Sequence, residues 1–283
     1  MRIQQFDLDR YSNPSEWQDH CFGLSADEVG EIARMTICVT GAATGYGLEI
    51  SRVLSVLGAT VILLSRRLSK LEAAKALLMS EGGDEHRIFI APVDLTKEKQ
   101  VTDYLCRFLS EYGEIHGWVN NAALPCKSPG RNQSPMLTLE LEDWQSIMQT
   151  NVTAPWYASR ELIRLHKPGN KLRIVNFSSL AGWSYKGGVG PYNVSKAALN
   201  NMTMSMAHET AMKMPDEDIQ MNVLIPTEAK SEMNQGSEES PLKIIPMLLK
   251  LLAQGFDGPN GYFFHHNGAS YRFTDRLPYA AGL

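Results

Sequence analysis

The stretch Thr40-Gly-Ala-Ala-Thr-Gly-Tyr-Gly47 decides the fold of this chain. It follows a β-type run at residues 36–40 and precedes an apolar helical pattern over residues 48–57. Three glycines between a strand and a helix let the backbone approach a bulky anion and leave helix N–H groups free to bind it. Because similar turns also occur without that purpose, the stretch alone predicts only a strand–turn–helix unit able to hold a phosphate.

Short apolar runs alternate with helical stretches along the rest of the chain. The expected strands are residues 36–40, 60–65, 87–91, 117–120, 171–177, 219–225 and 261–265, and the expected helices are residues 25–34, 68–80, 97–112, 139–166 and 191–214. Strands separated by helices predict a parallel sheet with helices on both faces. We therefore expect an α/β, doubly wound fold with a central, mostly parallel seven-stranded sheet.

One domain is expected, at residues 35–283, preceded by an N-terminal extension at residues 1–34. A substrate lid is expected around residues 227–255, since residues 231–240 are polar and read as a loop. The apolar run at residues 244–253 contains Pro246 and Lys250, and Lys243 directly precedes it. It predicts an amphipathic surface helix or a subunit contact and is too short for a membrane anchor.

Composition narrows the function classes. The chain has 283 residues, of which 43% are hydrophobic and 20% charged, so a sizeable core is expected. A net charge of −4 without a basic stripe argues against nucleic acid or an acidic membrane as partner. The four cysteines follow no metal or redox spacing, and adjacent His265 and His266 on a strand face opposite ways, so no metal site is expected. Without an apolar signal segment, cytoplasm is the expected location.

Polar residues follow the predicted strands at positions suited to chemistry. The most informative pair is Tyr192 and Lys196, which are four residues apart on a predicted helix and therefore share one face. A lysine ammonium beside a phenol favours the phenolate and lowers the tyrosine pKa below its reference of about 10. A general acid or base working near neutrality needs such a shift. On its own, a Tyr-x-x-x-Lys pair also arises by chance in long helices.

Four motifs together resemble the classical short-chain dehydrogenase/reductase family over residues 35–268. The stretch 40–47 matches its T-G-x-x-x-G-x-G cofactor turn, and residues 120–123 match N-N-A-G except for a final alanine. Ser179 lies 13 residues before Tyr192, and Asn151 lies 41 before it, as the family's catalytic serine and active-site asparagine do. The resemblance implies a Rossmann-fold domain and an oxidoreductase that interconverts a secondary alcohol and a carbonyl.

The resemblance also implies a role for each catalytic residue. Tyr192 would exchange a proton with the substrate oxygen while the nicotinamide exchanges a hydride with the same carbon. Ser179 would orient that oxygen, and Lys196 would hold the nicotinamide ribose and lower the Tyr192 pKa. Asn151 would hold a water that links Lys196 to solvent. Donors already in place would then meet the charge that develops on the oxygen.

The second predicted strand runs into Ser65-Arg66-Arg67 without a carboxylate. NAD-preferring folds usually place an acid there for the ribose 2′-hydroxyl, whereas an arginine receives the 2′-phosphate. The sequence therefore predicts NADP over NAD. The expected cofactor-binding residues are Gly41, Thr44, Gly45, Tyr46, Gly47, Ser65, Arg66, Arg67, Asp94, Leu95, Asn121, Ala122, Ala123, Tyr192, Lys196, Pro226 and Thr227.

Two positions depart from the family pattern. Pro226-Thr227 stands where the family usually has Pro-Gly. Thr227 therefore lacks the backbone freedom of glycine near the expected position of the nicotinamide amide, and Ala123 replaces the last glycine of N-N-A-G. The substrate pocket is expected from the residues after Ser179, the turn at residues 120–125 and the lid. Trp183 and Tyr185 are candidate pocket walls, although single aromatics more often pack in cores.

Two other functions remain open. A dehydratase or epimerase acting on a sugar or nucleotide-sugar would usually carry a G-x-x-G-x-x-G turn and a longer C-terminal part. A non-catalytic cofactor-sensing regulator would commonly lack the tyrosine or lysine that this chain has at positions 192 and 196. The family resemblance also implies a homodimer or homotetramer acting on a small molecule. The motifs do not identify the substrate or the physiological direction.

Overall fold

The computed structural model describes residues 21–125, 136–184, 187–226, 228–229 and 237–271. In this part of the chain the strands form one eight-stranded sheet in the order β3-β2-β1-β4-β5-β6-β7-β8. The strands are β1 (Thr36–Thr40), β2 (Thr60–Ser65), β3 (Ile88–Pro92), β4 (Gly117–Asn120), β5 (Lys171–Phe177), β6 (Asp218–Ile225), β7 (Phe263–His265) and β8 (Ser270–Tyr271).

The sheet confirms the doubly wound prediction. Strands β1 to β7 pair in parallel, and β8, a two-residue strand that the sequence did not predict, runs antiparallel to β7. The chain leaves β1 first toward β2 and β3 and later returns to β4 on the other side. The carboxyl ends of β1 and β4 therefore flank the point where the strand order reverses, which is where such sheets hold their ligands.

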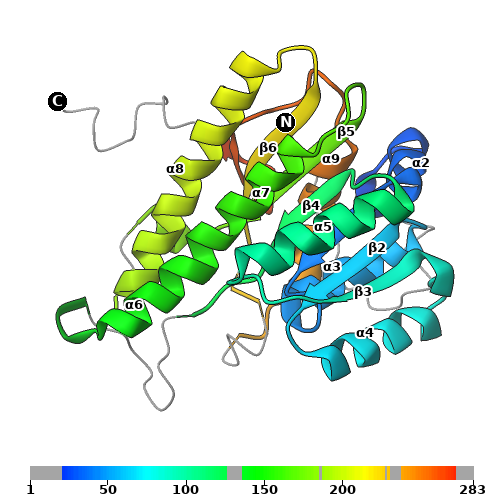
Figure 1. The fold of residues 1–283 in the computed structure, drawn as a ribbon. Helices are drawn as coiled ribbons and strands as arrows, with labels where there is room; N and C mark the ends of the chain where they lie inside the picture. The colour runs from blue at the N-terminus through cyan, green and yellow to red at the C-terminus, as the bar shows by residue number, and fades with distance from the viewer. Residues whose placement is uncertain (1–20, 126–135, 185–186, 227, 230–236, 272–283) are drawn as a thin grey trace.

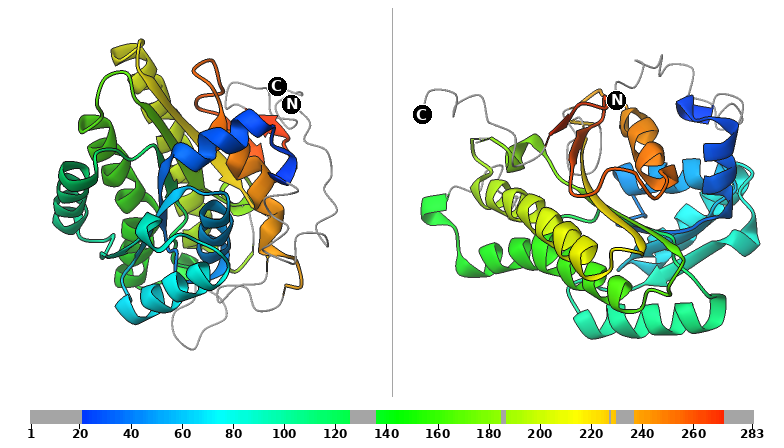
Figure 2. Two further views of the ribbon diagram at one scale, coloured as in Figure 1. Left: turned by 90° about the vertical axis from the view of Figure 1, so that its right-hand side faces the viewer. Right: turned by 90° about the horizontal axis from the view of Figure 1, so that it is seen from above.

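Helices cover both faces of the sheet (Figures 1 and 2). One face packs against α3, α4 and α9, with α2 beside α9, and the other packs against α5, α7 and α8. The helices are α2 (Ala26–Arg34), α3 (Gly45–Val56), α4 (Leu68–Ser80), α5 (Glu98–Tyr112), α6 (Leu141–Met148), α7 (Ala154–Arg164), α8 (Gly190–Lys213) and α9 (Ile245–Ala253). Short turns are η3 (Cys21–Gly23), η4 (Glu85–Arg87), η5 (Met136–Thr138), η7 (Leu180–Gly182) and η8 (Pro241–Ile244).

Strand β1 shows why the central strands are apolar throughout. Ile37 and Val39 point into the core on the α3 side, whereas Cys38 between them points into the core on the α5 side. Successive side chains of a strand face opposite ways, so a strand covered on both faces needs apolar residues at every position. All three side chains are fully buried. The burial also raises the pKa of the Cys38 thiol, as expected of a cysteine in a core.

The prediction that the helix at residues 244–253 lies on the surface is wrong. Helix α9 is buried along nearly its whole length and lies in the core cluster that covers one face of the sheet. It forms the later part of the segment predicted as a lid, whereas residues 227 and 230–236 of that segment lie outside the described residues. Within the described residues no helix is both long and apolar enough to cross a membrane.

The described part of the N-terminal extension is fastened to α9. Ser25 and Glu28 form a capping box, since each satisfies the other's backbone N–H group at the start of α2. The same Glu28 carboxylate accepts hydrogen bonds from Lys250 of α9 at 2.7 and 2.8 Å. Phe22, just before α2, is completely buried in the same core. Residues 21–34 therefore form part of the folded body.

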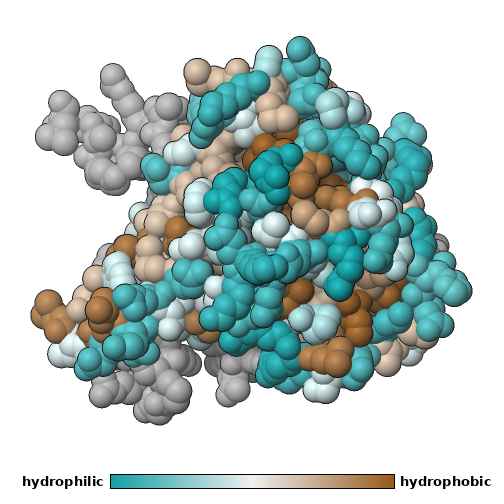
Figure 3. Space-filling model, in the orientation of Figure 1, coloured by the Kyte–Doolittle hydropathy of each residue, from teal (hydrophilic) through white to brown (hydrophobic). Residues whose placement is uncertain are grey.

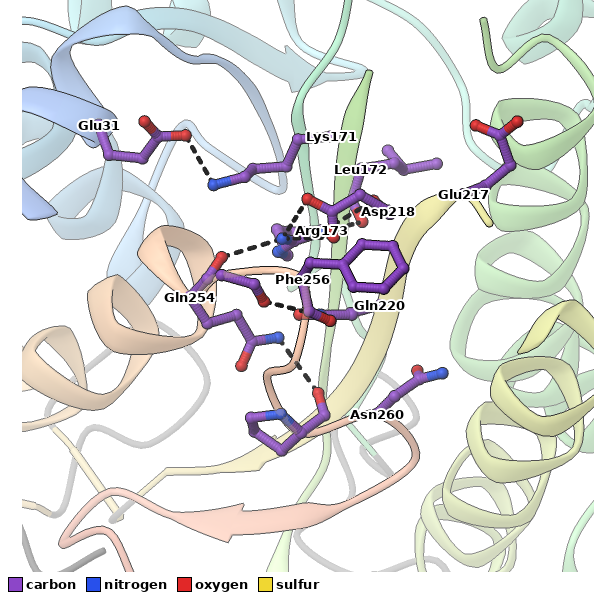
Figure 4. Close-up of polar contacts among 12 residues, drawn as sticks. Glu31, Lys171, Leu172, Arg173, Glu217, Asp218, Gln220, Gln254, Phe256 and Asn260 are labelled. Carbon is purple, nitrogen blue, oxygen red and sulfur yellow. Dashed lines mark hydrogen bonds and ion pairs between the residues drawn. The ribbon is translucent and has the colours of Figure 1, made fainter. Parts of the chain in front are cut away.

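A buried arginine organises the amino-terminal edge of the sheet (Figure 4). The Arg173 side chain is 1% exposed, and its guanidinium donates to the Asp218 carboxylate at 2.8 Å, to the Asp218 carbonyl at 2.9 Å and to the Gln254 carbonyl at 2.9 Å. Gln220 beside it donates to the carbonyls of Gly255 and Phe256. These bonds hold the connection from α9 to β7 against β5 and β6.

Replacing Arg173 by alanine is expected to lower the free energy of unfolding by about 3 kcal/mol. The change leaves Asp218 and the Gln254 carbonyl without their buried partner, which is costly in a water-poor interior. Urea denaturation followed by circular dichroism measures the difference. Arg34→Ala is the matched control, because Arg34 is 72% exposed and its ion pair with Glu31 contributes about 0–1 kcal/mol. Equal losses in both variants would contradict the prediction.

Candidate active site

The β1–α3 turn is tied to the end of β4. The Thr40 hydroxyl accepts hydrogen bonds from the backbone N–H groups of Asn121 and Ala122, both at 3.0 Å, and the Asn121 side chain donates to the Thr40 carbonyl at 2.9 Å. A Cβ atom at Gly47 would lie 2.3 Å from the Gly41 carbonyl oxygen, and Gly41 has a φ of +69°. Only glycine fits both places, so the turn stays narrow and open to a ligand.

A cavity of about 710 Å³ lies against this turn at the carboxyl ends of the strands. It brings together most of the residues singled out from the sequence: Gly41, Thr44, Gly45, Tyr46, Ser65, Arg66, Arg67, Asp94, Leu95, Asn121, Ala122, Ala123, Ser179, Tyr192, Lys196 and Pro226. Gly47 and Asn151 do not line it, and Thr227 and Tyr185 lie outside the described residues. Trp183 packs its ring on Phe263 at 5.4 Å and forms part of a core cluster instead.

The cavity can accommodate an elongated phosphate-bearing ligand. Thr44 precedes the first turn of α3 and makes no side-chain capping hydrogen bond to it, so N–H groups at the helix start remain available for an anion. The Ser178 hydroxyl, at the other end of the lining, is buried and has no partner among the described residues. A buried polar group without a partner is a position where a ligand or water is expected.

Lys196 and Tyr192 lie on the first turns of α8. The Lys196 ammonium is 5.5 Å from the centre of the Tyr192 ring and donates a hydrogen bond of 2.7 Å to the Phe177 carbonyl. Lys196 is only 3% exposed, and this burial lowers its pKa to about 7. The expected effect of Lys196 on Tyr192 requires the charged ammonium. In the folded protein, desolvation brings the pKa of Lys196 close to neutrality, so that both its charged and its neutral form are accessible there.

Ser179 caps the short turn η7, which rests on α8. Its hydroxyl accepts a hydrogen bond from the Ala181 N–H at 3.1 Å. A Cβ atom at Gly182 would lie 2.7 Å from the backbone carbon of Lys196, so only glycine allows η7 to approach α8 this closely. The Asn200 side chain also donates to the Gly182 carbonyl. Ser179 is thereby held at a constant position relative to Lys196.

The expected continuous helix at residues 139–166 is interrupted at Asn151. Helices α6 and α7 are joined by a π-helical segment, Gln149–Thr153. Pro155 explains the change, because it lacks the N–H that an α-helix would direct to the Asn151 carbonyl. The buried Asn151 side chain binds both backbone groups of Leu124, at 2.7 and 3.1 Å, and donates to the Ser195 hydroxyl at 3.0 Å. Asn151 therefore joins the β4 turn to α8.

Arginines line the opposite end of the cavity. Arg66 and Arg67 follow β2 and are exposed, and Asp94 lies across from them after β3. Burial raises the pKa of Asp94, but hydrogen bonds from Thr96 and the nearby Arg66 charge outweigh it, so the pKa lies below its usual value. Asp94 is therefore ionised at neutral pH and attracts the Arg66 guanidinium toward the cavity.

Several lining residues were missed by the sequence analysis. They are Val93, Thr96, Thr150, Phe177, Ser178 and Val189. All but Val189 are direct neighbours of a predicted residue or end a predicted strand, but none stands in a motif that distinguishes it from a core residue. Their role in the wall depends on how the strand ends and α8 converge, which spacing along the chain does not reveal.

The burial of Lys196 predicts a pH-dependent stability difference. Between about pH 7 and the unfolded value of 10.5, the unfolded chain binds more protons than the folded one. The penalty for burying Lys196 is fully present below pH 7 and disappears as pH rises toward 10.5. Relative to Lys196→Met, the wild-type free energy of unfolding should therefore rise with pH in that window, by about 1.4 kcal/mol per unit.

Denaturant unfolding of the two proteins across this range measures the difference. Lys99→Met is the control, because the Lys99 side chain is 85% exposed, and its curve should run parallel to wild type. Parallel curves for Lys196→Met as well would show that Lys196 is not held in a water-poor environment.

Comparison with known proteins supports one family. A family model described as short chain dehydrogenase matches residues 35–241. Gluconate 5-dehydrogenase from Gluconobacter oxydans is 28% identical over 212 residues, which cover 75% of this chain and 78% of the relative. An NADP-dependent 3-hydroxy acid dehydrogenase, YdfG, from Escherichia coli O6:H1 is 30% identical over 186 residues, covering 64% of this chain and 70% of the relative.

Solved structures support the same family. A protein from Escherichia coli CFT073, described as a candidate short chain dehydrogenase and solved with NADPH, superposes with a TM-score of 0.70 at 26% identity. The superposition covers 82% of this chain and 96% of that one. Together with the strand order and the cavity at its switch point, these likenesses assign the protein: the chain belongs to the short-chain dehydrogenase family and is an NAD(P)-dependent oxidoreductase.

Proposed function

We propose that the protein is an NADP(H)-dependent oxidoreductase that interconverts a secondary alcohol and a carbonyl. One observation carries the proposal: a single cavity is lined by the glycine turn at one side and by Ser179, Tyr192 and Lys196 at another. The turn suits a dinucleotide phosphate, and the three side chains suit proton transfer to an oxygen. Among the described residues, both sets of side chains already line the same cavity.

Each side chain has a distinct task in this proposal. The nicotinamide ring supplies or accepts the hydride. The Ser179 hydroxyl hydrogen-bonds the substrate oxygen, and the Tyr192 hydroxyl gives that oxygen a proton during reduction or takes one during oxidation. The η7 turn, which packs closely on α8, holds these two groups at a constant separation. Little reorganisation is then required as charge develops on the oxygen.

Lys196 and Asn151 support the proton transfer. With a pKa of about 7, Lys196 can both donate and accept a proton near neutrality. We propose that it binds the nicotinamide ribose and restores the proton of Tyr192, and that Asn151 holds a water connecting Lys196 to solvent. The bonds from Asn151 to Leu124 and Ser195 support a positioning role, since they set the π-helical segment beside α8.

Arg66 is the proposed receptor for the 2′-phosphate of NADP. It is exposed at the cavity wall and no carboxylate replaces it at the end of β2. An arginine can bind a phosphate through two parallel hydrogen bonds. The relative named for NADP dependence and the neighbour solved with NADPH are consistent with this preference.

We infer the remaining properties from the same features. The glycine spacing and the complete Ser179, Tyr192 and Lys196 set favour an alcohol–carbonyl reaction over a dehydratase, an epimerase or a regulator without turnover.

Apolar side chains are exposed at η5 and α6 (Figure 3), with Trp156 of α7 41% and Val194 of α8 38% exposed. They support a homodimer or homotetramer with contacts at α7 and α8. We propose a cytoplasmic location.

Tyr192→Phe is expected to reduce turnover by about 10²–10⁴-fold while leaving NADPH binding intact, because it removes the proton donor and keeps the ring. NADPH oxidation with a panel of ketones, aldehydes and 3-oxo esters measures turnover, and cofactor fluorescence measures binding. Tyr157→Phe is the control, since the buried Tyr157 hydroxyl has no partner among the described residues. Undiminished turnover in Tyr192→Phe would place the proton donor elsewhere.

Arg66→Ala is expected to raise the dissociation constant for NADPH about 10- to 100-fold and to leave that for NADH nearly unchanged. The reason is the loss of a charge-assisted contact that only the 2′-phosphate can make. Titration by calorimetry with both cofactors measures the two constants. Arg107→Ala removes an exposed arginine of α5 outside the cavity and should alter neither. Equal losses for NADPH and NADH in Arg66→Ala would refute the assignment.

A further inference from the structure

Tyr46 lies inside the glycine turn yet reaches well beyond it. Its backbone belongs to the first turn of α3, between Gly45 and Gly47. Its side chain lines the cavity, and its hydroxyl accepts a hydrogen bond of 3.1 Å from the backbone N–H of Ala229. Ala229 follows the end of β6, 183 residues further along the chain. The residue therefore has two separable parts, a backbone in the phosphate turn and a side chain on the segment after β6.

The segment after β6 forms a wall of the same cavity. Pro226, Glu228 and Ala229 all line it. Ala229 pairs with Glu239 in an isolated parallel β-bridge, and the Ser237 hydroxyl donates to the Glu228 carbonyl. The chain then enters η8, which packs back onto α3. Residues 228–229 are thus held between the Tyr46 hydroxyl on one side and the returning chain on the other.

The Tyr46 ring also touches the strand that carries the catalytic candidates. Its centre lies 6.1 Å from that of the Phe177 ring, at an interplanar angle of 59°. Phe177 ends β5 just before Ser178 and Ser179, and its carbonyl accepts the Lys196 hydrogen bond. Tyr46 therefore contacts the phosphate turn, the end of β5 and the wall after β6 at once.

The hydroxyl is needed because the Ala229 N–H is buried. Ala229 is only 2% exposed, and a buried N–H without a partner is strongly disfavoured. A phenylalanine at this position would keep the ring contact with Phe177 but offer no acceptor. The bond from the Ala229 N–H to the Tyr46 hydroxyl is thus the specific link between the turn and the wall.

We propose that Tyr46 is a positioning residue that couples cofactor binding at the turn to the placement of residues 228–229, the wall of the cavity beyond β6. A ligand that orders the first turn of α3 orders Tyr46 with it, and the Tyr46 hydroxyl in turn holds the wall against which the substrate lies. The inference rests on the proposed function, because it takes NADPH as the ligand of the turn.

Hydrogen exchange measured by mass spectrometry, with and without NADPH, tests the coupling in wild type, Tyr46→Phe and Tyr157→Phe. Without cofactor, residues 228–229 should exchange about tenfold faster in Tyr46→Phe than in the other two proteins. With NADPH, wild type should gain protection both at residues 41–47 and at residues 228–229. Tyr46→Phe should gain it only at residues 41–47, which a merely structural loss would not produce.

The outcomes distinguish failure of the Tyr46 coupling from failure of the proposed function. Equal exchange at residues 228–229 in Tyr46→Phe and wild type, or NADPH protection of that segment that survives in Tyr46→Phe, overturns the coupling. If NADPH protects neither segment in wild type, the proposed function is overturned. In that case the cofactor-free comparison still decides whether the Tyr46 hydroxyl holds the wall. Tyr157→Phe behaving like Tyr46→Phe would also contradict the inference, because Tyr157 packs in the core on the other face of the sheet and its hydroxyl has no hydrogen-bond partner among the described residues.

Discussion

The close contact between the β1–α3 turn and the end of β4 is the constraint on which the rest of this structure depends. Thr40 supplies one hydroxyl to two backbone N–H groups of the neighbouring turn, and the glycines let the two turns lie nearly atom against atom. The contact lies where the strand order reverses. It opens a cavity on the carboxyl side of the sheet while the strands below remain fully packed.

The chemistry of the site follows from how tightly α8 is held. Glycine at position 182 lets η7 rest directly on the backbone of Lys196, and the Asn151 side chain connects α8 to the β4 turn through Ser195. This packing removes water from Lys196 and lowers its pKa toward neutrality. The same burial that brings the pKa of Lys196 close to neutrality lowers the stability of the folded chain below about pH 7.

The sequence was a good guide to elements with strong local signals. The bounds of β1, β2, β4 and β5 agree with the predicted strands, and α2 begins and ends within one residue of the helix predicted at residues 25–34. It was a poor guide where tertiary contacts decide. Lys250 within the run at residues 244–253, and Lys243 just before it, suggested a surface helix. The apolar side chains of α9 are nevertheless buried in the core, and Lys250 pairs with Glu28. The continuous helix predicted at residues 139–166 is likewise interrupted, because Pro155 removes an N–H and the helix widens to a π-helical segment before it.

Residue types at set spacings were enough to predict the parallel α/β fold, the glycine turn and most of the residues that meet in the cavity. Tertiary structure alone decided the environment of those residues. The lowered pKa of Lys196 arises from desolvation by chain segments distant in sequence, and the bond between Tyr46 and Ala229 joins residues 183 positions apart. Burial and long-range contact depend on the packing of the whole chain, which no local pattern encodes.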